Sequence, residues 1–196
     1  MALKQIVAPE QELLAVGEVK NSLLLTHCAD DPLLTALLTT AREMVEAQCE
    51  RQFVTATWQL TLDKFPCGEG YPWREWGVIE LERPPIQADS VVITYVDANG
   101  DTQTLDEADY QVDVASEPGR IKPAFGLSWP TTRCQMNAVT VTFDAGYGEP
   151  TDVPDRAKQL VQLLVSHWYQ NREPVGNIGA EIPLAYQTLL NSLKWH

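Results

Sequence analysis

Apolar residues recur at three- and four-residue spacing in two stretches of the chain, one near each end. In the first stretch, Asp31 and Pro32 have the order of an N-cap residue and the first residue of a helix. The apolar positions that follow are Leu34, Leu37, Leu38, Ala41, Met44 and Val45. They share one face of a helix, which we expect to run to about Glu50. A shorter helix is predicted before it, with Val19 and Leu23 one turn apart, so the two form a helical hairpin.

The second helical stretch begins at Pro154. Its apolar positions are Ala157, Leu160, Val161, Leu164, Val165 and Trp168. The helix must end near Arg172, because Pro174 and Gly176 follow. A last helix is predicted from about Pro183 to Leu193. Short helices are marginal on their own, so we expect the N-terminal hairpin and the C-terminal helices to pack together.

Between these stretches the hydrophobic period changes to two. From Val54 to Leu62, apolar side chains alternate with threonine and glutamine, as in a half-buried strand. Further strands are predicted at Val91–Val96, Thr102–Leu105, Tyr110–Val114 and Val139–Phe143. Asn99-Gly100 lies between the first two of these and predicts a hairpin with a type I′ turn.

These patterns predict an α+β protein, a helical bundle from N- and C-terminal helices with an inserted, mostly antiparallel β domain. Residues 1–52 form the N-terminal helical hairpin. Residues 53–153 form the inserted β domain. Residues 154–196 form the C-terminal helices, which are expected to pack on the hairpin.

The net charge of −13 is unevenly distributed. Residues 53–153 carry six basic and sixteen acidic side chains. Tight binding of phosphate needs clustered Lys and Arg, and the sequence contains no such cluster. This argues against a DNA-binding regulator, but not against a surface past which DNA slides. No apolar run approaches the roughly 18–20 residues that span a bilayer, and the N-terminus lacks the order of a signal peptide. We therefore expect a soluble protein, made in a cytoplasm, with no membrane partner.

Residue patterns typical of catalysis or metal binding are weak in this chain. The four cysteines are Cys28, Cys49, Cys67 and Cys134, too widely spaced for a pre-organised zinc site. Asp97-x-Asn99-x-Asp101 lacks the glycine and glutamate positions of a calcium loop, and a hairpin accounts for the same residues. Ser166 and His167 are adjacent on a predicted helix, so their side chains diverge. We expect no catalytic residue, no metal, no cofactor and no enzymatic activity.

Candidate interaction residues gather toward the C-terminus. Trp168, Tyr169 and Arg172 combine aromatic and guanidinium groups, as interface anchors do, although a core role for Trp168 and a helix-terminal role for Arg172 explain them equally well. The last helix presents Leu184, Tyr186, Leu189, Leu190, Leu193 and Trp195. We expect its leucines to pack on the bundle, which leaves Tyr186 and Trp195 for a neighbouring copy or for another protein of the assembly.

A series of short motifs, each present once, extends along nearly the whole chain. They are Glu18-Val19-Lys20, Asp30-Asp31, Ala41-Arg42 with Val45-Glu46, Tyr95-Val96-Asp97 through Gly100, Ser128-Trp129-Pro130, Phe143-Asp144-Ala145-Gly146-Tyr147-Gly148, Val153-Pro154, His167-Trp168-Tyr169-x-Asn171-Arg172-Glu173, and Ile182-Pro183-Leu184-Ala185 leading to Leu189-Leu190. In this order and spacing, the chain resembles the head–tail connector (adaptor) proteins of tailed bacteriophages.

The resemblance implies a structural protein of the virion, located at the head–tail junction after assembly in the host cytoplasm. It implies a homo-oligomeric ring, typically of twelve copies, that docks beneath the portal protein and receives a stopper or tail-completion protein. Viral DNA would pass through the ring without specific binding. Two alternatives stay open: a phage stopper or tail terminator, and a small-molecule or sugar-binding module that uses exposed aromatics of the β domain (Tyr71, Trp73, Trp76).

Overall fold

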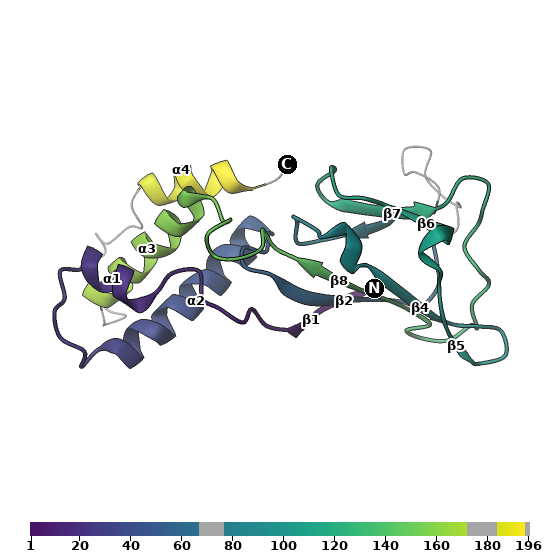
Figure 1. The fold of residues 1–196 in the computed structure, drawn as a ribbon, viewed down its shortest axis with the longest axis horizontal. Helices are drawn as coiled ribbons and strands as arrows, with labels where there is room; N and C mark the ends of the chain where they lie inside the picture. Colours follow the sequence, from purple (N-terminus) through teal and green to yellow (C-terminus); the bar gives the residue numbers. More distant parts are fainter. Residues whose placement is uncertain (67–76, 172–183, 195–196) are drawn as a thin grey trace. The chain divides into compact units, whose positions relative to one another are not determined.

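The computed structural model describes residues 1–66, 77–171 and 184–194 (Figure 1). The chain divides into two compact units. One, which we call the β unit, comprises Met1–Pro9 and Thr55–Gly146. The other, which we call the helical unit, comprises Glu10–Val54 and Tyr147–His196. The predicted α+β class is confirmed.

The helical unit is a bundle in which α2, α3 and α4 pack against one another and the short α1 lies beside α2 and α3 (Figure 1). The helices are α1 (Val16–Ser22), α2 (Asp31–Cys49), α3 (Asp155–Gln170) and α4 (Leu184–Leu193). The predicted apolar face of α3 is buried from Ala157 to Val165. On α2, four of the six predicted positions are buried, while Leu37 and Met44 pack only partly against the core.

The start of α2 differs from the prediction by one residue. Asp31 is already helical and Asp30 is the N-cap, without a capping hydrogen bond from its side chain. Both carboxylates have other partners, because Tyr169 donates its hydroxyl to Asp30 and Lys20 lies 2.8 Å from Asp31. The other end agrees with the prediction: Glu50 follows α2 with a left-handed backbone, φ 56°.

The described residues of the β unit form two antiparallel sheets. The larger has the strand order β1-β2-β8-β4-β5 and the smaller the order β3-β7-β6. Their bounds are Ala2–Val7 (β1), Ala56–Leu62 (β2), Ile79–Leu81 (β3), Val92–Val96 (β4), Thr102–Thr104 (β5), Tyr110–Asp113 (β6), Gly119–Pro123 (β7) and Val139–Ala145 (β8). Alternate residues of β8 are buried, from Val139 to Ala145. The core of this unit gathers apolar side chains from both sheets.

The first residues of the chain do not belong to the helical unit, contrary to the predicted hairpin over residues 1–52. They form strand β1, which pairs with β2 and places Leu3 opposite Leu60. Leu3 packs against the core of the β unit, while Ile6 and Val7 are exposed. A six-residue edge strand with one inward apolar side chain has no clear period, so the sequence did not reveal it. The β unit likewise ends at Gly146 rather than at residue 153.

The predicted β4–β5 hairpin is present, but its turn is not type I′. Gly100 has a positive φ of 99°, whereas Asn99 does not have a positive φ. The amide of Gly100 donates to the carbonyl of Asp97, and Asp97 pairs with Asp101, which makes a three-residue loop with a glycine bulge. The Asp97 carboxylate accepts the amides of Asn99, Gly100 and Asp101, and these contacts, the bond from Asp101 the largest, lower its pKa. A carboxylate used in this way explains why a turn other than type I′ forms here.

Candidate functional site

The aromatic pair at the end of α3 is half-buried in the helical unit. Trp168 packs against the apolar core of the bundle. The hydroxyl of Tyr169 donates to the Asp30 carboxylate, which ties the end of α3 to the start of α2. Arg172, the third member of this predicted group, lies outside the described residues. Within the chain, Trp168 and Tyr169 therefore serve the bundle itself.

The apolar side chains described on α4 turn into the bundle. Tyr186, Leu190 and Leu193 are between 1% and 4% exposed, and Leu189 is partly buried. The Tyr186 hydroxyl donates to the side-chain oxygen of Gln48 at 2.7 Å. The expectation that Tyr186 faces a neighbour is therefore wrong, because an aromatic ring with a polar tip finds both its apolar contacts and its hydrogen bond inside. Trp195 lies outside the described residues, as do Tyr71, Trp73 and Trp76.

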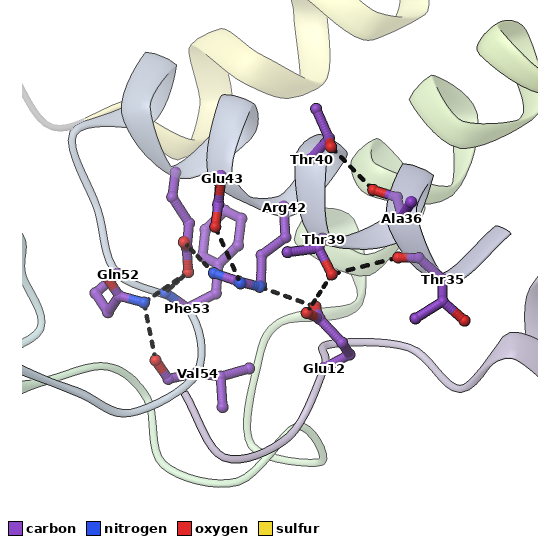
Figure 2. Close-up of polar contacts among 11 residues, drawn as sticks. Glu12, Thr35, Ala36, Thr39, Thr40, Arg42, Glu43, Gln52, Phe53 and Val54 are labelled. Atoms are coloured by element: carbon purple, nitrogen blue, oxygen red, sulfur yellow. Dashed lines mark hydrogen bonds and ion pairs between the residues drawn. The ribbon is translucent and has the colours of Figure 1, made fainter. Parts of the chain in front are cut away.

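A buried polar network surrounds the C-terminal half of α2 (Figure 2). Arg42 donates from Nε to Glu12 at 2.9 Å and from Nη1 to Glu46 at 2.8 Å. The other oxygen of Glu46 accepts the side-chain amide of Gln52 at 2.8 Å and the backbone amide of Phe53 at 2.9 Å. Arg42, Glu46 and Gln52 are between 1% and 6% exposed. The network holds three segments of the helical unit together: the segment around Glu12 that precedes α1, helix α2 and the chain that follows α2.

The electrostatics of this network are finely balanced. Burial raises the pKa of Glu46 to about 7, although the Arg42 charge and the Phe53 amide favour the ionised form. Burial alone would lower the pKa of Arg42, but its contacts with Glu12 and Glu46 raise it overall. Buried ionisable groups with shifted pKa values also occur in active sites. In this network, however, each named donor forms a hydrogen bond with an acceptor in the helical unit itself. The network is structural, and sequence reasoning missed it because Arg42 and Glu46 look like surface charges.

A cavity of about 460 Å³ lies in the helical unit beside this network. It is lined by Gln11, Glu12, Leu13, Leu14, Ala15, Val16, Glu18, Thr35, Leu38, Pro150, Thr151 and Lys158. No group of three metal-ligating side chains occurs in the described part of the chain. No described helix is long and apolar enough to cross a membrane.

Both units carry more acidic than basic side chains, but the charges are unevenly spread within each unit. In the β unit, residues 84–119 contain eight acidic and no basic side chains. In the helical unit, the exposed positions described on α4 (residues 186–193) are uncharged: Gln187, Thr188, Asn191 and Ser192. The exposed positions of α2 include a single charged residue, Glu43. Surface helices normally carry charges on their outer face, and depletion of charge is typical of the core of an interface. The described exposed positions of α2 and α4 therefore carry fewer charges than is usual for surface helices, whereas those of α3 include Asp155 and Arg156.

Three solved structures share this fold over nearly the whole chain. A chain from the neck of an empty GTA particle, computed with C6 symmetry, has 22% sequence identity and a TM-score of 0.78. A chain from the virion of a native gene transfer agent (GTA) particle has 21% identity and a TM-score of 0.79. A chain from the neck of a native GTA particle, computed with C12 symmetry, has 22% identity and a TM-score of 0.73.

Each of these likenesses covers 99% of this chain and 95% of the other. At this level of identity they establish a shared fold. No protein-family model matches the chain, and no curated protein does.

Proposed function

We propose that this chain is a structural neck protein of a tailed phage or phage-like particle, of the connector (adaptor) type. The observation that carries the proposal is the full-length likeness of fold to neck chains of GTA particles, with both chains covered almost entirely. If this chain were a binding module that forms part of larger, unrelated proteins, we would expect the likeness to cover only part of the other chain. The motif order along the sequence points to the same kind of protein.

In this role, copies of the chain form a ring that docks beneath the portal and receives a stopper or tail-completion protein. Twelve copies are proposed, a number compatible with the C6 and C12 symmetry under which the similar necks were computed. The described exposed positions of α2 and α4 carry one charge, that of Glu43, which supports self-association, because a chain of net charge −13 repels its own copies least through faces with few charges.

DNA passes through the proposed ring during packaging and ejection without being bound. The acidic stretch over residues 84–119 supports this part of the proposal, because like charges keep DNA from adhering to the surface it slides past. The role requires no catalytic group and no cofactor. The particle is assembled in the host cytoplasm, and the chain then remains at the head–tail junction of the virion.

Light scattering on the full chain mixed with the portal protein of the same particle tests the proposal. Twelve copies of the 21.9-kDa chain add about 263 kDa to the portal. A complex larger than the portal by this mass is the expected result. If the chain remains monomeric in this mixture even at high concentrations of both proteins, the proposal is overturned.

A further inference from the structure

The loop between β7 and β8, residues 124–138, carries several strongly exposed apolar side chains. Phe125 is 99% exposed, Met136 is 84% exposed and Leu127 is 52% exposed. Single apolar side chains on a surface are normal, whereas several on one loop are typical of a site that binds another molecule. The β7–β8 loop is therefore a candidate interaction surface.

The tip of this loop is a well-defined turn. The amide of Leu127 donates to the carbonyl of Ala124 at 2.9 Å, and Gly126 has a φ of 81°, as the third residue of a type II turn requires. The amide of Ala124 donates to the carbonyl of Asp109, which ties the turn to the segment before β6. Phe125 is the second residue of the turn. Because its backbone is already fixed, a partner that covers Phe125 does not have to order the tip of the loop.

The residues after the tip attach the loop to the β unit a second time. Trp129 donates from Nε1 to the carbonyl of Gly77 at 2.6 Å, and its ring stacks on Phe65 with 4.8 Å between the centroids. The amide of Arg133 donates to the carbonyl of Val96 at 3.0 Å. Trp129 thus serves the fold of the β unit, whereas Phe125 is left outside it.

The loop lies in an acid-free segment of an acidic chain. Residues 118–143 contain Arg120, Lys122 and Arg133 but no Asp or Glu, although the whole chain has a net charge of −13. Arg120 pairs with Asp113 at 2.7 Å. Lys122 and Arg133 are exposed, and no described residue forms an ion pair with either. Exposed apolar side chains beside unpaired cations fit an apolar surface that carries carboxylates.

We propose that the β7–β8 loop docks on another protein of the particle, one that presents an apolar pocket bordered by carboxylates. The inference rests on the proposed function, since it gives the chemistry of a partner of the neck protein. Phe125 fills the pocket, and Lys122, three residues before it, pairs with the carboxylates at the rim. Duplex DNA is a poorer occupant, because two unpaired cations neutralise few phosphates.

A second copy of the chain does not offer this chemistry in the cavity of its helical unit. Of the charged side chains that line the cavity, Glu12 is already paired with Arg42. The other two, Glu18 and Lys158, have opposite charges, so they offset each other. The cavity therefore lacks the acidic rim that the cations of the loop require, and a different protein is the better occupant.

Substitution of Phe125 tests the docking in the full chain. The portal and the tail-completion protein of the same particle are titrated separately with the wild-type chain and with Phe125→Ser. Leu24→Ser is the matched control, because Leu24 is an apolar residue that is 89% exposed and lies outside the loop. Both variants should melt as the wild-type chain does. Phe125→Ser should weaken binding to one of the two proteins by at least about thirtyfold, and Leu24→Ser by less than about twofold.

Charge reversal tests the acidic rim. Lys122→Glu should slow association with the same protein, and the loss should shrink as salt is added. Lys64→Glu makes the same change at an exposed position of the β unit outside the acid-free segment. This control should associate at nearly the wild-type rate. Equal slowing by both variants would show that net charge, and not the loop, governs the contact, which contradicts the inference.

A photocrosslinker identifies the occupant directly. Benzoylphenylalanine replaces Phe125, and the assembled particle is irradiated. The expected adduct joins the chain to a different protein of the particle, at a site with Asp or Glu beside apolar residues. An adduct of twice the 21.9-kDa mass of the chain, an adduct with DNA, or unchanged binding of Phe125→Ser to both proteins would overturn this inference and leave the proposed function standing. If the wild-type chain binds neither protein, the proposed function fails first.

Discussion

The guanidinium of Arg42 lies 2.8 Å from the carboxylate of Glu46, one turn further along α2, and both side chains are buried. The same guanidinium reaches Glu12 at 2.9 Å. Two carboxylates thus depend on one cation inside the helical unit. Removing that cation leaves the Glu46 carboxylate buried without its counter-charge, which is much more costly than losing the pair as a whole, whereas Glu12 is 31% exposed.

Arg42→Met should therefore lower the free energy of unfolding by about 3–5 kcal/mol. Urea denaturation of the purified chain measures this. Lys158→Met is the matched control, because Lys158 pairs only loosely with the fully exposed Asp155, at 4.0 Å. The control should change stability by less than about 0.5 kcal/mol. Equal effects of the two variants would show that the Arg42 network does not hold the unit together.

Stability should also depend on pH through Glu46. Its pKa is raised from 4.5 to about 7, so the folded chain binds this proton more tightly than the unfolded chain does. The contribution is complete below about pH 4.5 and is lost as the pH rises through about 7. Relative to Glu46→Gln, the wild-type chain should therefore be more stable at pH 5 than at pH 8, by about 1–3 kcal/mol. Urea denaturation at the two pH values gives the difference in unfolding free energy between the wild-type chain and Glu46→Gln. If this difference is the same at both pH values, or larger at pH 8, burial does not raise the pKa of Glu46.

The end of α4 should contribute to the stability of the monomer. Leu193 is 2% exposed, and its carbonyl accepts a hydrogen bond from Arg51 at 2.6 Å. Leu193→Ala should cost about 2–4 kcal/mol, as expected for a buried leucine, whereas Asn191→Ala at an exposed position should cost less than about 0.5 kcal/mol. Thermal melting compares the two. A Leu193→Ala chain that melts normally but no longer binds the portal would place this side chain in the interface instead.

Duplex DNA should bind the chain very weakly. With eight acidic and no basic side chains over residues 84–119, the β unit offers few sites for phosphate. Filter binding at low salt should detect almost no retained DNA. Submicromolar binding that weakens steeply with added salt would contradict the proposed bore, because it requires a cluster of Lys or Arg that the charge distribution does not provide.

The helices were predictable because their apolar positions repeat over many residues. The face of α3 from Ala157 to Val165 agrees with its predicted period, since sixteen helical residues give that period several turns in which to show. Strand β1 was missed because six residues with one inward side chain give no period. The position of the hairpin after β4 was predicted correctly, but its turn type was not. The turn type depends on the hydrogen bonds that the Asp97 carboxylate accepts from the backbone of the loop.

The candidate site was less predictable than the fold. Leu37 and Met44 were predicted together with the buried positions of α2, because three- and four-residue spacing does not separate the centre of an apolar face from its edge. Tyr186 looked like an interface residue because its partner, Gln48, is 138 positions away in the chain. Arg42 and Glu46 resembled an ordinary surface pair at four-residue spacing, and only their burial reveals their role.

Rotational averaging of negative-stain micrographs of the chain bound to its portal is the most direct test of the account. A closed ring of twelve subunits beneath the portal, centred on the DNA path, is the predicted result. Single copies scattered on the portal, or a portal with no added density, would contradict the assignment of this chain to the neck.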